Sequence, residues 1–323
     1  MSRDVIIAGI DEAGYGPILG PLVVSATAWR IAARDASDSL WDILRRSVSP
    51  SPSVRDARVP IVDSKRLFKQ KAGLGRLERS VLGVVGTWRG IPPTLAALLR
   101  LVAPEAIDRL RGYPWYGASE RPLPVSADRG AVRIAASLLG ADMKAHGIRS
   151  AGFWSEVLPE AHYNRRVAAT RNKAVVLLGL TMRLIQRVAQ IWPDHELRIF
   201  IDKQGARDHY GAVLMRSFAD RRLHVVLEGH DQSVYELTGG AAAWQIGFRQ
   251  SGESQHLPVA MASMVSKYLR EVLMGCFNAY WSEQVPGLRP TAGYYQDGQR
   301  FLRDVAPHLR RLGIVRDQLV RTR

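Results

Sequence analysis

The sequence predicts an α/β domain, and three observations lead to that fold class. Short β-rich runs alternate along the chain with longer apolar helical patterns, as in domains whose helices pack on a central sheet. The 323 residues are 46% apolar, which is enough to bury a substantial core. No internal repeat or low-complexity tract interrupts the alternation. We therefore expect a single domain over residues 1–323.

Apolar runs bounded by Gly and Pro predict the strands. The first two, Asp4–Ile10 and Leu22–Trp29, are joined by a Gly- and Pro-rich segment and are expected to be neighbours. The later strands are expected at 148–158, 197–202 and 224–229, followed by a hairpin of 233–237 and 243–250.

Helical periodicity predicts the layers that cover the sheet. Helices are expected at 39–46, 68–85, 130–147 behind a polar cap at 126–128, 172–191 and 259–281, with an Arg-rich helical segment at 295–323. Residues 90–125 are rich in Pro and aromatic residues and hold only short helical pieces. We interpret residues 89–147 as an insertion within the domain.

The charge of the chain points to a polyanionic partner. Lys and Arg number 45 against 30 Asp and Glu, a formal net charge of +15. A genome that favours Arg codons is the alternative explanation, and charge alone does not separate RNA, DNA and an anionic membrane. The single Cys276 excludes an intramolecular disulfide and a cysteine-rich zinc site, which fits a reducing cytoplasm.

The expected location is the cytoplasm. The N-terminal apolar run is too short for a signal peptide, and no window approaches the ~18 apolar residues of a membrane span. No membrane association is expected, and no obligate protein partner is evident in the sequence.

Adjacent carboxylates end the first strand at Asp11 and Glu12, just before a turn with Gly14 and Gly16, and Asp202 ends a later strand. Strands of an α/β sheet can bring their carboxyl ends together, so these acids can converge. Converging carboxylates need a compensating cation, and Mg²⁺ prefers oxygen ligands. Two such ions can promote phosphodiester hydrolysis, so an acidic cluster in a basic protein indicates a nuclease. Solvated strand ends remain the alternative for each acid alone.

Four segments resemble the type 2 ribonucleases H, the bacterial ribonucleases HII and HIII. The stretch GIDEAGYGPILGP from Gly9 resembles the opening signature of that family, which reads roughly GIDEAGRGPLAGP. The segment DSK at 63–65 is similar to a second block, and RIFID, ending in Asp202, to the third acidic strand. Residues 252–271, GESQHLPVAMASMVSKYLRE, resemble a fourth block without a gap. The segment around Tyr294 is faintly similar to a later segment that carries a functional tyrosine.

The resemblance implies a ribonuclease H-like fold, a central mixed β-sheet flanked by helices. It also implies a Mg²⁺- or Mn²⁺-dependent endonuclease that cuts the RNA strand of an RNA/DNA hybrid, or ribonucleotide-containing DNA, leaving a 5′-phosphate and a 3′-hydroxyl. The metal ligands and catalytic residues that it implies are Asp11, Glu12, Asp202 and Glu253, where most family members carry Asp at the fourth position. Glu228 and Asp231 are alternative fourth ligands.

Substrate contacts follow from the same resemblance. The implied substrate-binding residues are Gly14, Tyr15, Gly16, Lys65, Lys267 and Tyr294. The main departure is Tyr15, because family members carry Arg or Lys in a turn that recognises the 2′-hydroxyl and phosphate at the cleavage site. Backbone recognition by the glycines can persist without that charge, so the sequence leaves open whether a single embedded ribonucleotide is cut.

Two further sets of residues are candidates for nucleic-acid contact. Aromatic residues that either stack on bases or pack the insertion are Trp88, Tyr113, Trp115 and Tyr116. Arginines that either grip the hybrid backbone or form a solvated face are Arg300, Arg303, Arg310, Arg311, Arg316, Arg321 and Arg323. The rival functions are a related nuclease that acts on DNA or structured nucleic acid, and a non-catalytic nucleic-acid binder.

Overall fold

A seven-stranded mixed sheet forms the centre of the described chain, which in this computed structural model comprises residues 4–52, 57–68, 73–117, 120–205 and 207–322. The strand order is β5-β2-β1-β6-β9-β8-β7, with β1, β6 and β9 parallel and the other neighbours antiparallel. The strands are β1 (Asp4–Ala13), β2 (Leu22–Ala32), β5 (Arg149–Leu158), β6 (Glu196–Asp202), β7 (Arg222–Glu228), β8 (Gln232–Thr238) and β9 (Trp244–Arg249), with a small separate parallel pair of β3 (Val48–Ser49) and β4 (Val59–Pro60).

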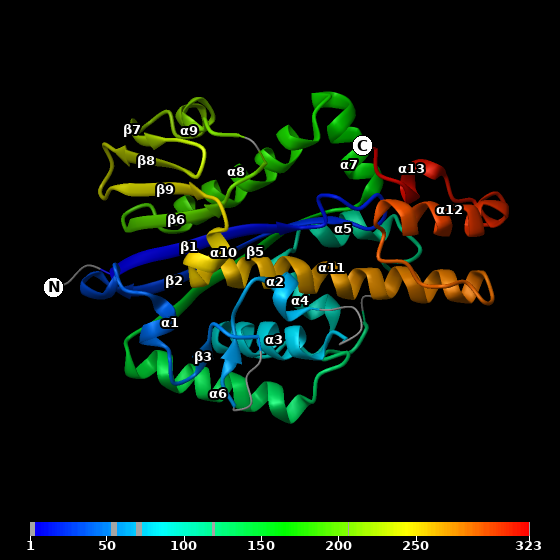
Figure 1. Cartoon of the computed structure of the whole chain (residues 1–323), viewed down its shortest axis with the longest axis horizontal. Helices are drawn as coiled ribbons and strands as arrows, with labels where there is room; N and C mark the ends of the chain where they lie inside the picture. Colours follow the sequence, from blue (N-terminus) through cyan, green and yellow to red (C-terminus); the bar gives the residue numbers. More distant parts are fainter. Residues whose placement is uncertain (1–3, 53–56, 69–72, 118–119, 206, 323) are drawn as a thin grey trace.

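Helices lie on both sides of the sheet (Figure 1). The longest, α11, crosses one face together with α3 and α6, whereas α8 and α9 lie on the other. The helices are η1 (Ala33–Asp35), α1 (Leu40–Ile43), α2 (Ser64–Leu67), α3 (Gly75–Arg89), α4 (Leu95–Val102), α5 (Ala106–Arg111), α6 (Arg129–Ala145), α7 (Glu160–Thr170), α8 (Lys173–Ile191), α9 (Gly211–Ser217), α10 (Gly252–Gln255), α11 (Leu257–Gln284), α12 (Tyr295–Leu309) and α13 (Arg316–Leu319). The predicted fold class, a central mixed sheet flanked by helices, is confirmed.

Strand β1 separates two hydrophobic clusters. Val5 and Ile7 belong to the cluster under α3, α6 and α11, and Ile6, Ala8 and Ile10 belong to the cluster under α8. Successive side chains of a strand point to opposite faces, so a strand covered on both sides must be apolar throughout. This accounts for the continuous apolar run VIIAGI, which Asp11 and Glu12 follow within the last three residues of the strand.

Close packing of α11 on β1 brings the fourth sequence block to the sheet. A Cβ atom at Gly9 would lie 2.1 Å from the carbonyl carbon of Pro258, so only glycine allows this approach. The hydroxyl of Thr27 donates to the carbonyl of Pro258 at 2.8 Å and fixes the start of the helix against β2. Helix α10, which directly precedes α11, is thereby held beside the end of β6.

Residues 89–147, predicted as an insertion, are built into the main core. Side chains of this segment, including Leu98 and Leu139, belong to the same buried cluster as Val5 of β1. The aromatic cluster is part of this packing, because Trp115 lies 5.5 Å from the ring of Phe277. The aromatic residues that are buried there are Tyr113, Trp115 and Tyr116. Their burial contradicts the base-stacking alternative for these three residues.

Helix α8 corrects one expectation from the sequence. By length and composition it is the one helix of the described chain that could cross a membrane, although no apolar window of that length was expected. Its Leu177, Leu180, Ile185 and Val188 are buried in the cluster between the helix and the sheet. Packing in the protein core therefore accounts for the apolar composition.

Candidate active site

Two parallel strands bring the predicted acids together. In the β1–β6 ladder Ile10 is paired with Ile201, so Asp11 and Asp202 follow at adjacent strand ends. Glu12 extends β1 by one residue beyond Asp11. The apolar strands thus deliver three carboxyl groups to one edge of the sheet, as the sequence predicts from the strand-end rule.

Helix α10 adds Glu253 to this edge. The carboxylate of Asp202 accepts a hydrogen bond from the backbone N–H of Gly252 at 2.9 Å, which holds the next residue, Glu253, at the end of β6. The Glu253 carboxyl group is close enough to Asp202 to raise the pKa of Asp202. Its Oε2 atom is buried and has no hydrogen-bond partner within the described residues. The cluster therefore contains a desolvated oxygen that is available to another ligand.

The alternative fourth acids lie elsewhere. The Glu228 carboxylate accepts from the hydroxyl of Tyr235 and is paired with His209 at 2.7 Å. Asp231 is exposed and pairs with His230. Of the three candidates, Glu253 is the one that interacts electrostatically with Asp11, Glu12 and Asp202.

Burial and mutual repulsion raise the pKa values of the clustered acids. Burial raises the pKa of Asp202 from 3.8 to about 8, with added repulsion from Asp11 and Glu253. Burial, followed by repulsion from Asp202, raises the pKa of Glu12 from 4.5 to about 7. Burial and Glu12 also raise the pKa of Asp11 well above its usual range. Without a counter-charge the cluster therefore holds its protons to near-neutral pH.

A divalent cation fits this donor set by its chemistry. Four carboxyl groups, one of them with a partnerless buried oxygen, offer hard oxygen ligands and a strong demand for positive charge. As the side chains stand, no group of three or more His, Cys, Asp or Glu residues in the described chain is arranged to hold a metal ion. The side chains would have to rotate to enclose one.

The raised pKa values predict that the metal-free protein loses stability as the pH rises. In the unfolded chain Asp202 and Glu12 release protons near 3.8 and 4.5, but in the folded protein only near 8 and 7. Between about pH 4 and 8 the folded state binds more protons, so the free energy of unfolding falls with increasing pH. Urea unfolding in EDTA should show a loss of about 4 kcal/mol or more between pH 5 and 8.5, since Asp202 alone contributes about 1.4 kcal/mol per pH unit up to about pH 8.

The control for this pH dependence is a pair of matched variants. Asp202→Asn should reduce the pH dependence and raise the stability at pH 8.5. Asp108→Asn, at an exposed position, should leave the pH dependence as in the wild type. A pH dependence that Asp202→Asn leaves unchanged would contradict the assignment.

The turn after β1 presents backbone next to the acids. Gly14 has a φ of +89°, and a Cβ atom there would lie 2.7 Å from the carbonyl oxygen of Pro21, so the turn requires glycine. Gly16 is exposed, and a Cβ atom there would meet nothing within 4 Å. Tyr15, between them, is partly exposed. The turn thus leaves open space in front of Gly16.

Two buried guanidinium groups hold this turn from behind. Arg270 of α11 donates to the carbonyls of Pro21 at 2.6 Å and Leu19 at 3.0 Å. Arg321, only 2% exposed, donates to the carbonyls of Gly14 and Pro17. The C-terminal segment therefore packs against the turn and restricts its position.

The predicted substrate-binding lysines differ in their surroundings. Lys65 follows Asp63, which caps α2 by accepting from the Lys65 N–H at 2.9 Å. Burial acts to lower the pKa of Lys65, but Asp63 and the clustered acids outweigh it, so the pKa is raised. Lys267 instead pairs with Glu271 at 2.7 Å and lies 4.6 Å from the ring of Phe68. Lys65 therefore lies near the acids, and Lys267 is engaged by neighbours.

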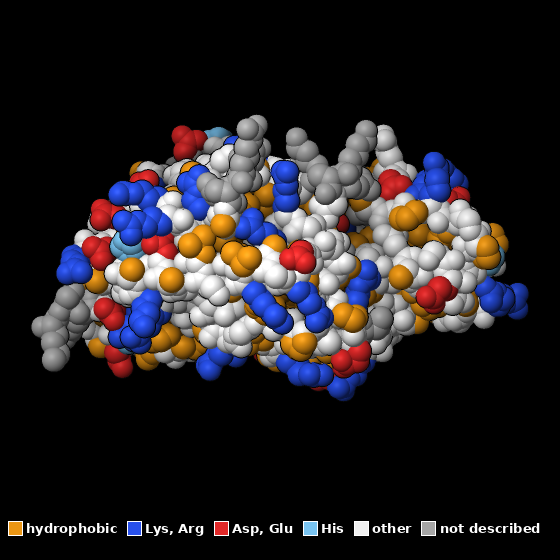
Figure 2. Space-filling model, turned by 90° about the horizontal axis from the view of Figure 1, so that it is seen from below, with side chains coloured by type: hydrophobic (Ala, Val, Ile, Leu, Met, Phe, Trp, Pro, Cys, Tyr) orange, Lys and Arg blue, Asp and Glu red, His pale blue; other side chains and the backbone are white. Residues whose placement is uncertain are grey.

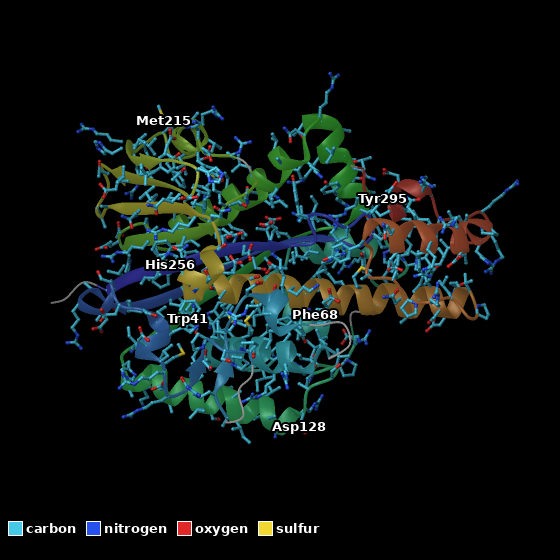
Figure 3. All side chains as sticks on the ribbon, in the orientation of Figure 1. Trp41, Phe68, Asp128, Met215, His256 and Tyr295 are labelled. Atoms are coloured by element: carbon cyan, nitrogen blue, oxygen red, sulfur yellow. The ribbon has the colours of Figure 1, made fainter. Side chains whose placement is uncertain are left out.

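Tyr294 lies beside the turn, not in the core. It is 55% exposed at the start of α12. The carbonyl of the preceding Gly293 accepts from the N–H groups of Ile18 at 2.8 Å and Leu19 at 3.2 Å. The structure thus places residues 18–19 beside residues 293–294, while Tyr295, labelled in Figure 3, is the first residue of α12.

The predicted C-terminal arginines are not all free to bind a substrate. Arg321 is buried, and Arg300 pairs with Asp297 at 2.6 Å and Asp304 at 3.1 Å. Arg323 lies outside the described residues. The backbone grip predicted for this set is therefore wrong for Arg321 and Arg300 as the structure stands.

Sequence reasoning missed several groups that support the site. The ring of His256, labelled in Figure 3, stacks on the ring of Phe200 with 3.7 Å between the ring centroids. His256 is three residues after Glu253, and Phe200 is two residues before Asp202. The hydroxyl of Ser263 acts to lower the pKa of Asp11 and lies 3.0 Å from the hydroxyl of Ser64. An Arg inside an apolar helix, as at Arg270, is the one signal that could have indicated a buried polar network.

Neither a protein-family model nor a curated protein matches this chain. Among solved structures, the chain is similar to the ribonuclease HII of Archaeoglobus fulgidus in its complex with PCNA, at 16% identity and a TM-score of 0.48 over 98% of this chain and 94% of that one. It is similar to Bst-RNase HIII in complex with Mn²⁺ at 16% identity and a TM-score of 0.41, over 99% and 66% of the two chains. The third similar structure is ribonuclease H2 from Pyrococcus horikoshii OT3, at 11% identity and a TM-score of 0.40, over 97% and 92%.

Proposed function

We propose that this protein is a divalent-metal-dependent endonuclease that hydrolyses the RNA strand of RNA/DNA hybrids to give a 5′-phosphate and a 3′-hydroxyl. The observation that carries the proposal is a cluster of four carboxyl groups, one buried and three partly buried, on two adjacent strands and α10, beside a turn with open space in front of Gly16. The net charge of +15 suits a polyanionic substrate.

Asp11, Glu12, Asp202 and Glu253 would hold Mg²⁺ or Mn²⁺. When bound, such ions activate water and stabilise the charge that develops on phosphate oxygens. The chain itself contributes the positions of the carboxyl groups: the β1–β6 ladder sets two of them, and the Gly252 N–H fixes Asp202. The partnerless oxygen of Glu253 is the donor that most needs a ligand.

Backbone and side chains around the turn would hold the substrate. The exposed backbone at Gly16 can approach a sugar–phosphate chain closely, and a 2′-hydroxyl distinguishes RNA from DNA. Lys65, close to the acids, would contact a phosphate. Tyr294 would face the substrate from α12, since it is exposed beside the turn. Lys267 would have to break its ion pair with Glu271 before it could contact a phosphate.

Tyr15 supports a second candidate function. Its side chain carries no charge, so the turn lacks the basic group expected for recognition of a ribonucleotide junction. A nuclease of the same fold that acts on DNA or on structured nucleic acid is therefore the alternative. Substrate comparison separates the two candidates, and metal-dependent cleavage separates both from a non-catalytic binder.

We expect cleavage of an end-labelled RNA/DNA hybrid with Mg²⁺ or Mn²⁺, with 3′-hydroxyl products and no cleavage in EDTA. Duplex DNA, duplex RNA and duplex DNA with one embedded ribonucleotide should be assayed beside it, with Asp11→Asn as the inactive control. Cleavage of the embedded ribonucleotide as well would mean that Tyr15 suffices for junction recognition. Cleavage of duplex DNA alone would favour the alternative, and no metal-dependent cleavage of any substrate would contradict both.

A further inference from the structure

Basic side chains cluster where α7 ends and α8 begins. We define the α7–α8 ridge as Arg165, Arg166, Arg171 and Lys173. Three of these are exposed and Arg166 is half-buried. Within the described residues, none of the four has an Asp or Glu within ion-pair distance. The ridge is therefore a patch of uncompensated positive charge on the α8 side of the sheet.

Neighbouring arginines make this patch more crowded. Glu156, the carboxylate that acts on Arg166, is already paired with Arg109 at 3.0 Å and Arg183 at 3.0 Å. Burial, followed by repulsion from Arg183 and Arg109, lowers the pKa of Arg166. Like charges held this close disfavour each other unless an anion lies between them or over them. The patch is thus suited to a partner that carries repeated negative charge.

The backbone at the top of the ridge is in a conformation that glycine normally adopts. Arg171 has φ 52° and ψ 21° at the end of α7, and its N–H donates to the carbonyl of Val167 at 2.6 Å. Asn172 then caps α8 by accepting from the N–H of Ala174 at 2.8 Å. An Arg where Gly would be less strained fixes a charged side chain at the junction between two helices.

Lys173 connects the ridge to the acid cluster. Its ammonium group lies 5.1 Å from the centroid of the Tyr15 ring, in the range of a cation–π contact. Tyr15 belongs to the turn beside the acids, and its pKa responds to Glu12. The positive charge that the turn itself lacks is therefore supplied from α8, 158 positions later in the sequence.

We propose that the α7–α8 ridge binds the phosphate backbone of a nucleic acid duplex and that Lys173, held over Tyr15, contacts a phosphate next to the scissile one. The inference rests on the proposed function for the position of the scissile phosphate, but binding by the ridge itself requires no cleavage. Several exposed Lys and Arg side chains, one of which reaches the turn beside the acids, suit a continuous polyanion better than a single anion.

The test is equilibrium binding of a fluorescent RNA/DNA hybrid in EDTA, measured by anisotropy at several KCl concentrations. The ridge variant is Arg171→Gln/Lys173→Gln. The matched control is Arg133→Gln/Lys144→Gln, which removes two exposed charges from α6 across the sheet. Figure 2, seen from below Figure 1, shows basic side chains there scattered among acidic and apolar ones. Thermal unfolding would establish that each variant is folded.

We expect the ridge variant to bind the hybrid about tenfold more weakly, with the slope of log K against log[KCl] reduced in magnitude by about 2, since each phosphate contact contributes about 1. The control should keep the wild-type slope. Equal slopes for all three proteins would overturn the proposal. It would also be overturned if the ridge variant lost binding to anionic phosphatidylserine vesicles but kept its binding to the hybrid. A wild type that binds with the expected slope but cuts no substrate would contradict the proposed function and leave the ridge assignment standing.

Discussion

Replacement of Asp202 by Asn is expected to reduce metal-dependent cleavage of the hybrid by about 10³-fold or more, the scale of loss when a group acting on the transition state is removed. In the wild type the Asp202 carboxylate accepts from the Gly252 N–H at 2.9 Å. Asn keeps an oxygen that can accept the same hydrogen bond, so α10 should stay in place. The variant removes a negative charge from the cation ligands without a change in volume. Single-turnover cleavage with saturating Mn²⁺ measures the effect on the chemical step.

Asp231→Asn is the matched control for this prediction. Asp231 is an exposed acid near the hairpin and pairs only with His230 among the described ion pairs. The Asp231→Asn variant should cleave the hybrid as the wild type does. Glu253→Gln should lose cleavage activity, whereas Glu228→Gln should keep it. Cleavage by Asp202→Asn within tenfold of the wild type would remove the four acids from the proposed mechanism, whatever the fold.

The convergence of the acids could be predicted from the sequence because it depends on local patterns. The apolar run of β1 is followed directly by Asp11, and β6 ends at Asp202. Parallel pairing then aligns the two ends, as the partnership of Ile10 with Ile201 shows. The fourth position was left open between Glu253, Glu228 and Asp231, because the direction of a hairpin side chain depends on its partners, here Tyr235 and His209.

Contacts between distant segments could not be predicted from the sequence. Arg321 reaches the carbonyl of Gly14 across 307 positions, and no local pattern distinguishes it from the other arginines of the C-terminus. The pairing of Lys173 with Tyr15 depends likewise on how α8 packs against the sheet. Composition predicted a basic surface, whereas the fold decides which basic groups are exposed, which are paired and which are buried under the turn.

Arg270→Met is expected to destabilise the protein by about 3–5 kcal/mol. The guanidinium group is 2% exposed and donates to the carbonyls of Leu19, Pro21 and Ala292 at 2.6–3.2 Å. Met fills much of the volume but leaves these buried acceptors without partners, and each orphaned acceptor costs about 1–3 kcal/mol. Urea unfolding, with the slope m compared between variants, measures the loss.

Arg270→Lys and Arg303→Met distinguish a specific hydrogen-bonding role from general sensitivity of the chain. Lys keeps the charge but has one nitrogen where Arg uses two, so it should lose an intermediate amount of stability. Arg303 is exposed on α12 and should change stability by less than about 0.5 kcal/mol. If Arg270→Met were as stable as Arg303→Met, the turn would hold its shape without the buried guanidinium. Gly14 and Gly20 both have positive φ, so without the hydrogen bonds from Arg270 the turn can adopt other conformations. Arg270→Met should therefore also weaken binding of the hybrid.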